Sequence, residues 1–389
     1  VAVGHAVRAM YLYSAMADLA METGDRSLAD VCRTLWNNVT EKQMYVTGSI
    51  GSTEFGEAFS FDYDLPNDTA YNETCAAIGL VFWAHRMLHM DLDSRYADVM
   101  ERALYNGVLS GISLDGTRYF YVNPLEVWPE ACRRRRDKSH VAPTRQKWFG
   151  CACCPPNIAR LLASFPQYVY STTRDGVYVH IYTSSRARVN VCGQSVAITQ
   201  STAYPWQGTV EVKVSPERPL EFTLSLRVPG WCRAYQVKVN GSAIDPCALV
   251  KRGYVRIRRT WQHGDKVDLT LAMPVERVRA NPAVRAAAGK VAIQRGPLVY
   301  CLEEVDNGPI LTDISIPRGA TLEARFEPEL LGGVVVVTGQ AQRTDYPSSE
   351  RSLYTTREYP SRPVRITAIP YFAWDNREPG EMLVWIREA

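Results

Sequence analysis

Hydrophobic residues recur with the 3.6-residue period of an α-helix through the first 170 residues of the chain. This pattern predicts helices over residues 3–22, 27–40, 69–90, 94–110 and 156–170. Gly24 ends the first of them, and Asp68 or Thr69 is the expected N-cap of the third. Long loops at 47–68 and 128–150 separate the helices, and ordered loops of this kind often carry functional residues.

After residue 175 hydrophobic and polar residues alternate with a period of two, as they do along a half-buried β-strand. The clearest segments are GVYVHIYTSSRARVNV, GTVEVKVS, EFTLSLRVPGW, YQVKVNG, YVRIRRTW and KVDLTLAM. Gly, Pro, Asn and Asp separate them, which is typical of an antiparallel β-sandwich. A second β-rich block follows at 291–303, 332–339 and 363–374.

The two patterns together predict an α+β multidomain protein. We expect a helical domain over 1–170, a β-sandwich over 171–280 and a second β-sandwich over 281–389. Helices separated by long structured loops suit an α/α barrel or a large helical bundle. Val1 lies directly within the first helical pattern, without a Met or a signal peptide, so we expect the chain to begin inside a domain.

Composition and charge exclude several classes of protein. The 389 residues are 46% hydrophobic and 22% charged, the balance of a globular protein rather than a disordered or fibrous one. The formal net charge of +3 is too small to indicate a nucleic-acid or anionic-membrane partner. No stretch approaches the ~20 apolar residues that a membrane span requires.

Three of the 10 cysteines lie close together in CACCPPN, at 151–157. Proline is favoured at the first helical position, so Cys153 and Cys154 are expected at or just before a helix N-terminus, where a thiol pKa is lowered. Two adjacent thiols there form a nucleophile, half of a zinc site, or both. The alternatives are a vicinal disulfide and buried thiols without a function. The crowding favours thiolate or metal chemistry in a reducing compartment, and we expect a cytoplasmic protein.

Glu73 and Cys75 form a second candidate element. Residues two apart point to opposite sides of a regular helix, so they share a metal only if this turn is irregular, as at the start of the third helix. With Cys153 and Cys154 they supply one carboxylate and three thiolates, a chemically suitable set for tetrahedral zinc. The spacing matches no zinc finger, and the alternative is a capping Glu73 with Cys75 in the core.

Glu57 lies in the loop TEFGEAFSFDYDLP, between Phe55 and Phe59. A carboxyl group beside aromatic rings can act as a general acid, although the pattern by itself favours a solvated loop carboxylate. Asp62 and Asp64 follow in the same loop but lack the spacing of a calcium-binding loop, so turn and capping roles are expected for them.

Other polar residues carry weaker signals. His85 and His89 are four residues apart on a predicted helix and could bind metal, but we expect them on the surface. The basic run at 133–136 is expected to be solvated, and His5 by default caps a helix or lies in the core. P-loop, nucleophile-elbow and dinucleotide-binding motifs are absent from the sequence.

Four segments carry a resemblance to a known family: GSIGSTEFGEAFSFDYDLPNDTAYNETCA, RQKWFGCACCPPNIARLLAS, QRGPLVYCLE and AIPYFAWDNREPGEMLVWIR. The chain resembles glycoside hydrolase family 127 essentially from Val1 to Ala389, and its best-known members are β-L-arabinofuranosidases. The resemblance implies the C-terminal half of an (α/α)6 barrel followed by two antiparallel β-sandwiches. It also implies that the N-terminal half of the barrel is missing upstream.

The resemblance further implies a retaining glycosidase with a cysteine nucleophile. Cys153 is then both the nucleophile and a zinc ligand, and Glu57 is the general acid/base. His5 and Tyr121 match sugar-contacting positions, and Cys151 receives no ligand role. The implied zinc ligands are Glu73, Cys75, Cys153 and Cys154.

The leading interpretation is an exo-glycosidase that releases L-arabinofuranose from the non-reducing end of a glycan. One alternative is a member of the same family that acts on another L-sugar or a branched acidic sugar. Another is a non-catalytic carbohydrate-binding protein with a structural zinc. The β-sandwiches are candidate contacts for a homodimer.

Overall fold

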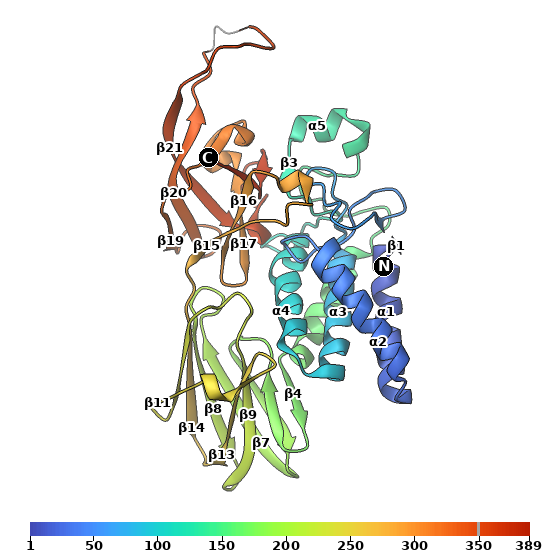
Figure 1. The fold of residues 1–389 in the computed structure, drawn as a ribbon, viewed down its shortest axis with the longest axis vertical. Coiled ribbons are helices and arrows are strands. Elements are labelled where there is room, and N and C mark those ends of the chain that lie inside the picture. The colour runs from blue at the N-terminus through green and yellow to red at the C-terminus, as the bar shows by residue number, and fades with distance from the viewer. Residues whose placement is uncertain (348–350) are drawn as a thin grey trace.

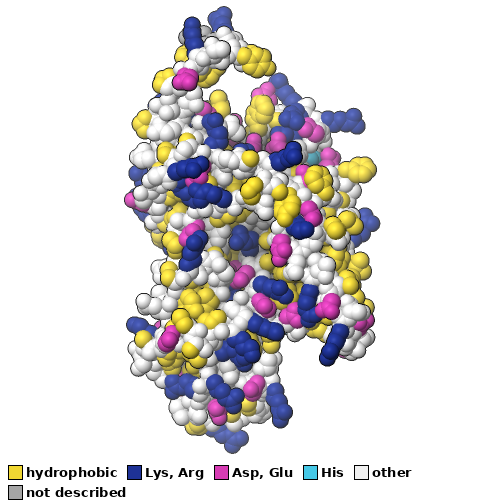
Figure 2. Space-filling model, viewed as in Figure 1, with side chains coloured by type: hydrophobic (Ala, Val, Ile, Leu, Met, Phe, Trp, Pro, Cys, Tyr) yellow, Lys and Arg dark blue, Asp and Glu magenta, His cyan; other side chains and the backbone are white. Residues whose placement is uncertain are grey.

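The computed structural model describes residues 1–347 and 351–389 and contains one helical and two β-rich units (Figure 1). In Figure 1 the helical unit lies beside the column formed by the two β-rich units. The protein is therefore a multidomain α+β protein, as expected. Among the described residues, every helix is too short or too polar to cross a membrane. Basic and acidic side chains are interspersed over the face shown in Figure 2, in keeping with the small net charge.

The helical unit is organised around α3, which packs against α1, α4 and α6. Most side chains of α3 are buried, and Trp83 meets Trp36 of α2 with ring centroids 5.0 Å apart. A helix that is apolar on all sides belongs in a core rather than at a surface. The α-helices are α1 Ala6–Thr23, α2 Arg26–Asn38, α3 Thr74–Asp91, α4 Ser94–Arg102, α5 Pro129–Arg134, α6 Cys154–Ser164 and α7 Glu304–Asn307. Shorter helical segments are Val39–Gln43, Ala103–Val108, Leu109–Gly111, Arg136–Lys138, Phe165–Tyr168, Cys247–Leu249, Arg285–Ala287, Leu311–Asp313 and Tyr371–Ala373.

The third helix begins at Thr74, and the prediction that it begins at Thr69 is wrong. The backbone just before Thr74 pairs with other segments instead of coiling. Glu73 bridges to Val122, and Asn72, with a left-handed φ of 40°, donates its N–H to the carbonyl of Gly51 at 2.8 Å. These long-range hydrogen bonds are invisible to a periodicity argument and outweigh the local helical pattern.

The middle β-rich unit consists of two packed sheets. Its strands alternate as expected, with Val210, Val212 and Val214 of β8 buried among the side chains of the opposite sheet. One sheet contains, in spatial order, β11 Ser242–Ile244, β10 Tyr235–Val239, β14 Asp265–Leu271, β8 Thr209–Pro216, β7 Gln194–Thr202 and β6 Ser185–Val191. The other contains β12 Val250–Lys251, β13 Tyr254–Trp261, β9 Leu220–Arg227, β5 Gly176–Val179 and β4 Tyr170–Thr173.

In the C-terminal unit, the described strands form one continuous sheet rather than the two sheets expected of a sandwich over 281–389. The pairing of β16 with β17 closes the sheet on itself. Alternation determines which side chains face inward but not which strands become neighbours. In spatial order, the strands of this sheet are β15 Val275–Val278, β16 Lys290–Arg295, β23 Ile386–Glu388, β18 Ile314–Ile316, β20 Val334–Thr344, β21 Ser361–Pro370, β17 Leu298–Glu303, β22 Met382–Leu383 and β3 Glu126–Val127. Strand β19 Leu322–Glu327 pairs with β20.

A buried ion-pair network joins the helical unit to the middle unit. Arg227 at the end of β9 is fully buried and donates to Asp98 at 2.5 Å and to Glu101, both on α4. Tyr204 donates to the same Glu101 carboxylate at 2.6 Å. A buried guanidinium bonded to two carboxylates in this way fixes α4 against the sandwich.

Candidate active site

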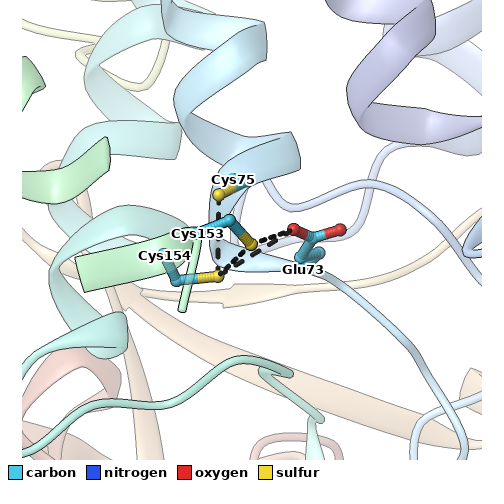
Figure 3. A group of neighbouring side chains, drawn as sticks. All are labelled: Glu73, Cys75, Cys153 and Cys154. Carbon is cyan, nitrogen blue, oxygen red and sulfur yellow. Dashed lines mark hydrogen bonds between the residues drawn. The ribbon is translucent and has the colours of Figure 1, made fainter. Parts of the chain in front are cut away.

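Two helix N-termini bring the carboxylate and thiol candidates together. Glu73 is the N-cap of α3, with φ −59° and ψ 135°, so it lies outside the helix and its side chain is free to turn towards that of Cys75. Cys153 is the N-cap of α6, and Cys154 is the first residue of that helix, ahead of two prolines. Figure 3 shows the four side chains converging from these two helix starts. The irregular turn that a shared metal requires is therefore present.

The four ligand atoms have the spacing of a metal site. The Cys75 and Cys154 sulfurs are 3.6 Å apart, and those of Cys153 and Cys154 are 3.7 Å apart. Glu73 Oε1 lies 3.4 Å from the Cys153 sulfur and 3.9 Å from the Cys154 sulfur. A tetrahedron with metal–sulfur bonds of about 2.3 Å has edges of about 3.8 Å, so the observed separations suit one ion at the centre.

The cluster also contains an unsatisfied polar atom. Glu73 is buried, and its Oε2 lacks a hydrogen-bond partner among the described residues. A buried carboxylate oxygen without a partner is costly unless an ion or a water molecule occupies the space beside it. Glu73, Cys75, Cys153 and Cys154 can therefore bind a metal ion.

Without a metal, the four groups hold less negative charge than four separate ligands would. Burial, and then the Cys153 thiolate, raise the pKa of Glu73 to about 8. Hydrogen bonds from Cys154 and then Cys75 hold the pKa of Cys153 far below that of a free thiol, whereas the pKa of Cys154 is raised. Cys153 is thus the thiol that ionises first, and it is also the half-buried one, since Cys75 and Cys154 are buried.

Glu57 lies in a tight turn at the tip of its loop. Its φ is 52°, and it follows Gly56 with φ 70°, so two consecutive residues adopt the left-handed conformation. The turn is held against the start of α1 by the pairing of β1 Gly4–His5 with β2 Ala58–Phe59. The backbone strain of a non-glycine residue in this conformation is of the kind that clusters at functional sites.

The Glu57 carboxylate is oriented through both of its oxygens. Tyr71 donates its hydroxyl hydrogen to Oε1 at 3.0 Å, and His5 Nε2 lies 2.9 Å from Oε2. Burial, followed by the charge of Glu57, raises the pKa of Tyr71, so its hydroxyl stays protonated and can donate. Two fixed partners restrict the carboxylate to one orientation.

Glu57 and Cys153 face one cavity of about 550 Å³. Tyr121 also lines this cavity, and its hydroxyl is among the groups that lower the pKa of Cys153. The cavity is lined by His5, Val7, Arg8, Tyr11, Glu57, Glu73, Cys75, Tyr121, Cys151, Cys153, Pro156, Asn157 and Arg160. Of the residues expected to be catalytic, sugar-contacting or metal-binding, Cys154 alone lies outside this lining, buried next to Cys153.

Sequence reasoning missed several residues at this site. Arg8 lies in the first turn of α1, three residues after the N-cap His5, and lines the same cavity, so its position in sequence is a signal that could have identified it. Arg160 bonds the Tyr11 hydroxyl at 2.5 Å and Asn157 at 2.7 Å, which fixes its position on the cavity wall. Tyr71 gave no local signal, because its role depends on how two loops meet.

The weaker candidates lie away from the cavity. His85 is half-buried, with its ring centroid 4.6 Å from that of Tyr168, so the prediction that it lies on the surface is wrong, whereas His89 is exposed. Asp62 accepts hydrogen bonds from Asn38 at 2.9 Å and Lys42 at 3.1 Å, so its side chain joins segments distant in sequence rather than capping a turn. The arginines at 133–136 are exposed, as expected.

Three family models match consecutive parts of the chain. They are the catalytic domain of the GH127 β-L-arabinofuranosidases at residues 1–167, the middle domain of the same enzymes at 176–273, and the glycoside hydrolase family 127 C-terminal domain at 275–387. The chain belongs to glycoside hydrolase family 127.

Individual relatives agree with this assignment. The chain is 42% identical over 396 residues to a non-reducing end β-L-arabinofuranosidase of Bifidobacterium longum subsp. longum, covering 99% of this chain and 59% of the relative. A crystal structure of a GH127 β-L-arabinofuranosidase from Geobacillus stearothermophilus T6 matches with 60% identity and a TM-score of 0.98, over 100% of this chain and 61% of the other. A second GH127 β-arabinofuranosidase matches with 40% identity and a TM-score of 0.92, over 100% of this chain and 60% of the other. The chain thus spans about three fifths of the length of these relatives.

Proposed function

We propose that this protein is a retaining exo-glycosidase that hydrolyses non-reducing terminal β-L-arabinofuranosides, with Cys153 as the nucleophile and Glu57 as the general acid/base. The observation that carries the proposal is the exposure of Cys153. It is the accessible thiol of the metal cluster, and it faces the cavity that Glu57 also lines. The names of the relatives supply the sugar.

We infer that the metal is zinc, held by Glu73, Cys75, Cys153 and Cys154. Zinc binds thiolate ligands well and is usually held by four ligands in a tetrahedron. The three cysteines and Glu73 supply ligands of this type and number. When bound, zinc would keep the Cys153 thiolate ionised at neutral pH.

In the first step, the Cys153 sulfur attacks the anomeric carbon while the bond to the leaving oxygen breaks. Protonated Glu57 transfers its proton to that oxygen, so the alcohol departs neutral. In the second step, ionised Glu57 takes a proton from water, whose oxygen attacks the anomeric carbon. The carbon–sulfur bond breaks, and Cys153 returns to a thiolate.

The other cavity residues orient these groups. Tyr71 and His5 hold the Glu57 carboxylate, and Tyr121 helps to lower the pKa of the Cys153 thiol. We assign His5 and Tyr121 as sugar contacts as well, since both line the cavity that Glu57 and Cys153 face. We also infer that α1–α4 and α6 form part of an (α/α)6 barrel, which is supported by their packing around a shared core.

The stereochemistry of the first product tests the proposed function. Two displacements at one carbon leave its configuration unchanged, so we expect an aryl β-L-arabinofuranoside to release the β-anomer first. Proton NMR during the first minutes of hydrolysis measures the anomer before mutarotation, and the α-linked substrate serves as the control. Initial release of the α-anomer would contradict a cysteine nucleophile.

Glu57→Gln tests the acid. We expect kcat/KM for alkyl arabinosides to fall by roughly a hundredfold to ten-thousandfold, the usual contribution of a general acid. An aryl substrate with a good leaving group needs little protonation, so its first step should be nearly as fast as in the parent protein. Steady-state rates for alkyl and aryl pairs measure this, with Glu54→Gln in the same loop as the matched control. Equal losses for both substrates would count against the assignment.

A further inference from the structure

A second cavity, of about 220 Å³, lies where the helical unit meets the start of the C-terminal unit. The loop after α2 contributes Tyr45, Tyr63 and Leu65 to its wall, and the C-terminal unit contributes Val278, Val284 and Trp385. The lining shares no residue with that of the active-site cavity. Most of the side chains that line this second cavity are apolar or aromatic, as in most small-molecule pockets.

Arg102, the last residue of α4, also lines this second cavity, and none of the salt bridges among the described residues includes it. The nearest carboxylates on its own helix, Asp98 and Glu101, are both bonded to Arg227 instead. Arg102 donates one nitrogen to the carbonyl of Val46 at 2.9 Å and, at 3.5 Å, to Gln294. Among the described residues it forms no ion pair, so the rest of its guanidinium is available to a ligand.

The other cations of this cavity are already paired. Lys42 bonds Asp62 at 3.1 Å, and Arg279 bonds Glu388 at 2.6 Å. Glu41, a carboxylate at the cavity, is exposed to solvent and forms no ion pair with Arg102 among the described residues. Burial lowers the pKa of Arg102, and the nearby charges of Asp98 and Glu101 offset this only in part. A half-buried guanidinium with planar donors and no acid partner is complementary to a carboxylate.

We propose that this cavity is a binding site for a small organic monocarboxylate with a flat apolar body. The carboxylate bonds Arg102, and the body packs against the aromatic and aliphatic wall. A ligand held there contacts the helical unit and the C-terminal unit at once, so it stabilises their junction. The site is separate from the catalytic cavity and does not depend on the function proposed for it.

The probes are cinnamate, its neutral analogue cinnamyl alcohol, and acetate, which carries the charge without the body. Isothermal titration calorimetry and thermal unfolding measure binding to the whole chain. We expect saturable binding of cinnamate and a rise in Tm, with the other two probes at least about tenfold weaker, because each lacks one of the two interactions. Equal binding of cinnamyl alcohol, or no saturable binding of cinnamate, would overturn the proposal.

Three variants locate the site. Arg102→Met should weaken cinnamate binding by about tenfold or more, since it removes a charged hydrogen-bonding partner. Arg279→Met removes a paired cation at the rim of the same cavity and should change the Kd for cinnamate by less than about threefold. Ala280→Trp fills the cavity and keeps Arg102, so it remains informative if Arg102→Met does not fold. Unchanged binding in Ala280→Trp would place cinnamate elsewhere and refute the assignment.

Discussion

Cys153→Ser is expected to lower kcat/KM for β-L-arabinofuranosides by roughly a thousandfold or more, the scale of losing a covalent nucleophile. A serine hydroxyl is far less ionised than a thiol, and the hydrogen bonds of Cys154 and Cys75 that hold Cys153 as a thiolate cannot ionise an alcohol to the same degree. The serine side chain occupies the same half-buried position and the other three proposed zinc ligands remain, so the fold should persist. Steady-state hydrolysis of an aryl substrate and thermal unfolding measure the two effects separately.

Cys151→Ser is the matched control. Cys151 belongs to the same motif and lines the same cavity, but it is exposed and lies outside the metal cluster. This variant should retain most activity. Residual activity above a few per cent in Cys153→Ser would refute the nucleophile assignment.

Intact-mass measurement of Glu57→Gln with an activated substrate should show one added pentosyl group, and Cys153→Ser in the same background should abolish it.

Metal removal is expected to have the other large effect. Native mass spectrometry should find one zinc per chain, and chelation should abolish hydrolysis and lower the Tm. The free energy of binding for structural zinc is on the order of 10 kcal/mol at neutral pH, enough to affect the stability of the whole helical unit. Affinity should fall as the pH falls, because Glu73, whose pKa is raised to about 8 without metal, and the thiols must lose protons to bind.

Variants of the buried ligands separate the metal from the nucleophile. Cys154→Ala and Glu73→Gln each remove one proposed zinc ligand, so they should reduce the zinc content. Both side chains are buried, and Cys153 itself is unchanged in these variants. Cys247→Ser removes an exposed thiol far along the chain in the middle unit and should leave the zinc content unchanged. A metal-free parent chain, or full zinc content in both ligand variants, would refute the zinc site.

The sequence was sufficient for features that depend on neighbouring residues. Alternation along β8 and β13 predicted strands, because a half-buried strand must present every second side chain to the core. The prolines after Cys154 predicted a helix start, because proline suits a first turn that has no N–H partners. The chemical types at Glu73, Cys75, Cys153 and Cys154 already matched a thiolate-rich metal site before their distances were known.

Tertiary structure determined every feature that joins distant segments. The start of α3 moved to Thr74 because Asn72 and Glu73 pair with Gly51 and Val122, and the C-terminal strands closed into one sheet through β16 and β17. Tyr71 reached Glu57 only through the meeting of two loops, and the two acids that precede Arg102 on α4 form their ion pairs with Arg227 of the middle unit. Local patterns specify which side chains are buried, whereas hydrogen bonds and charges are satisfied by whichever groups the folded chain brings within reach.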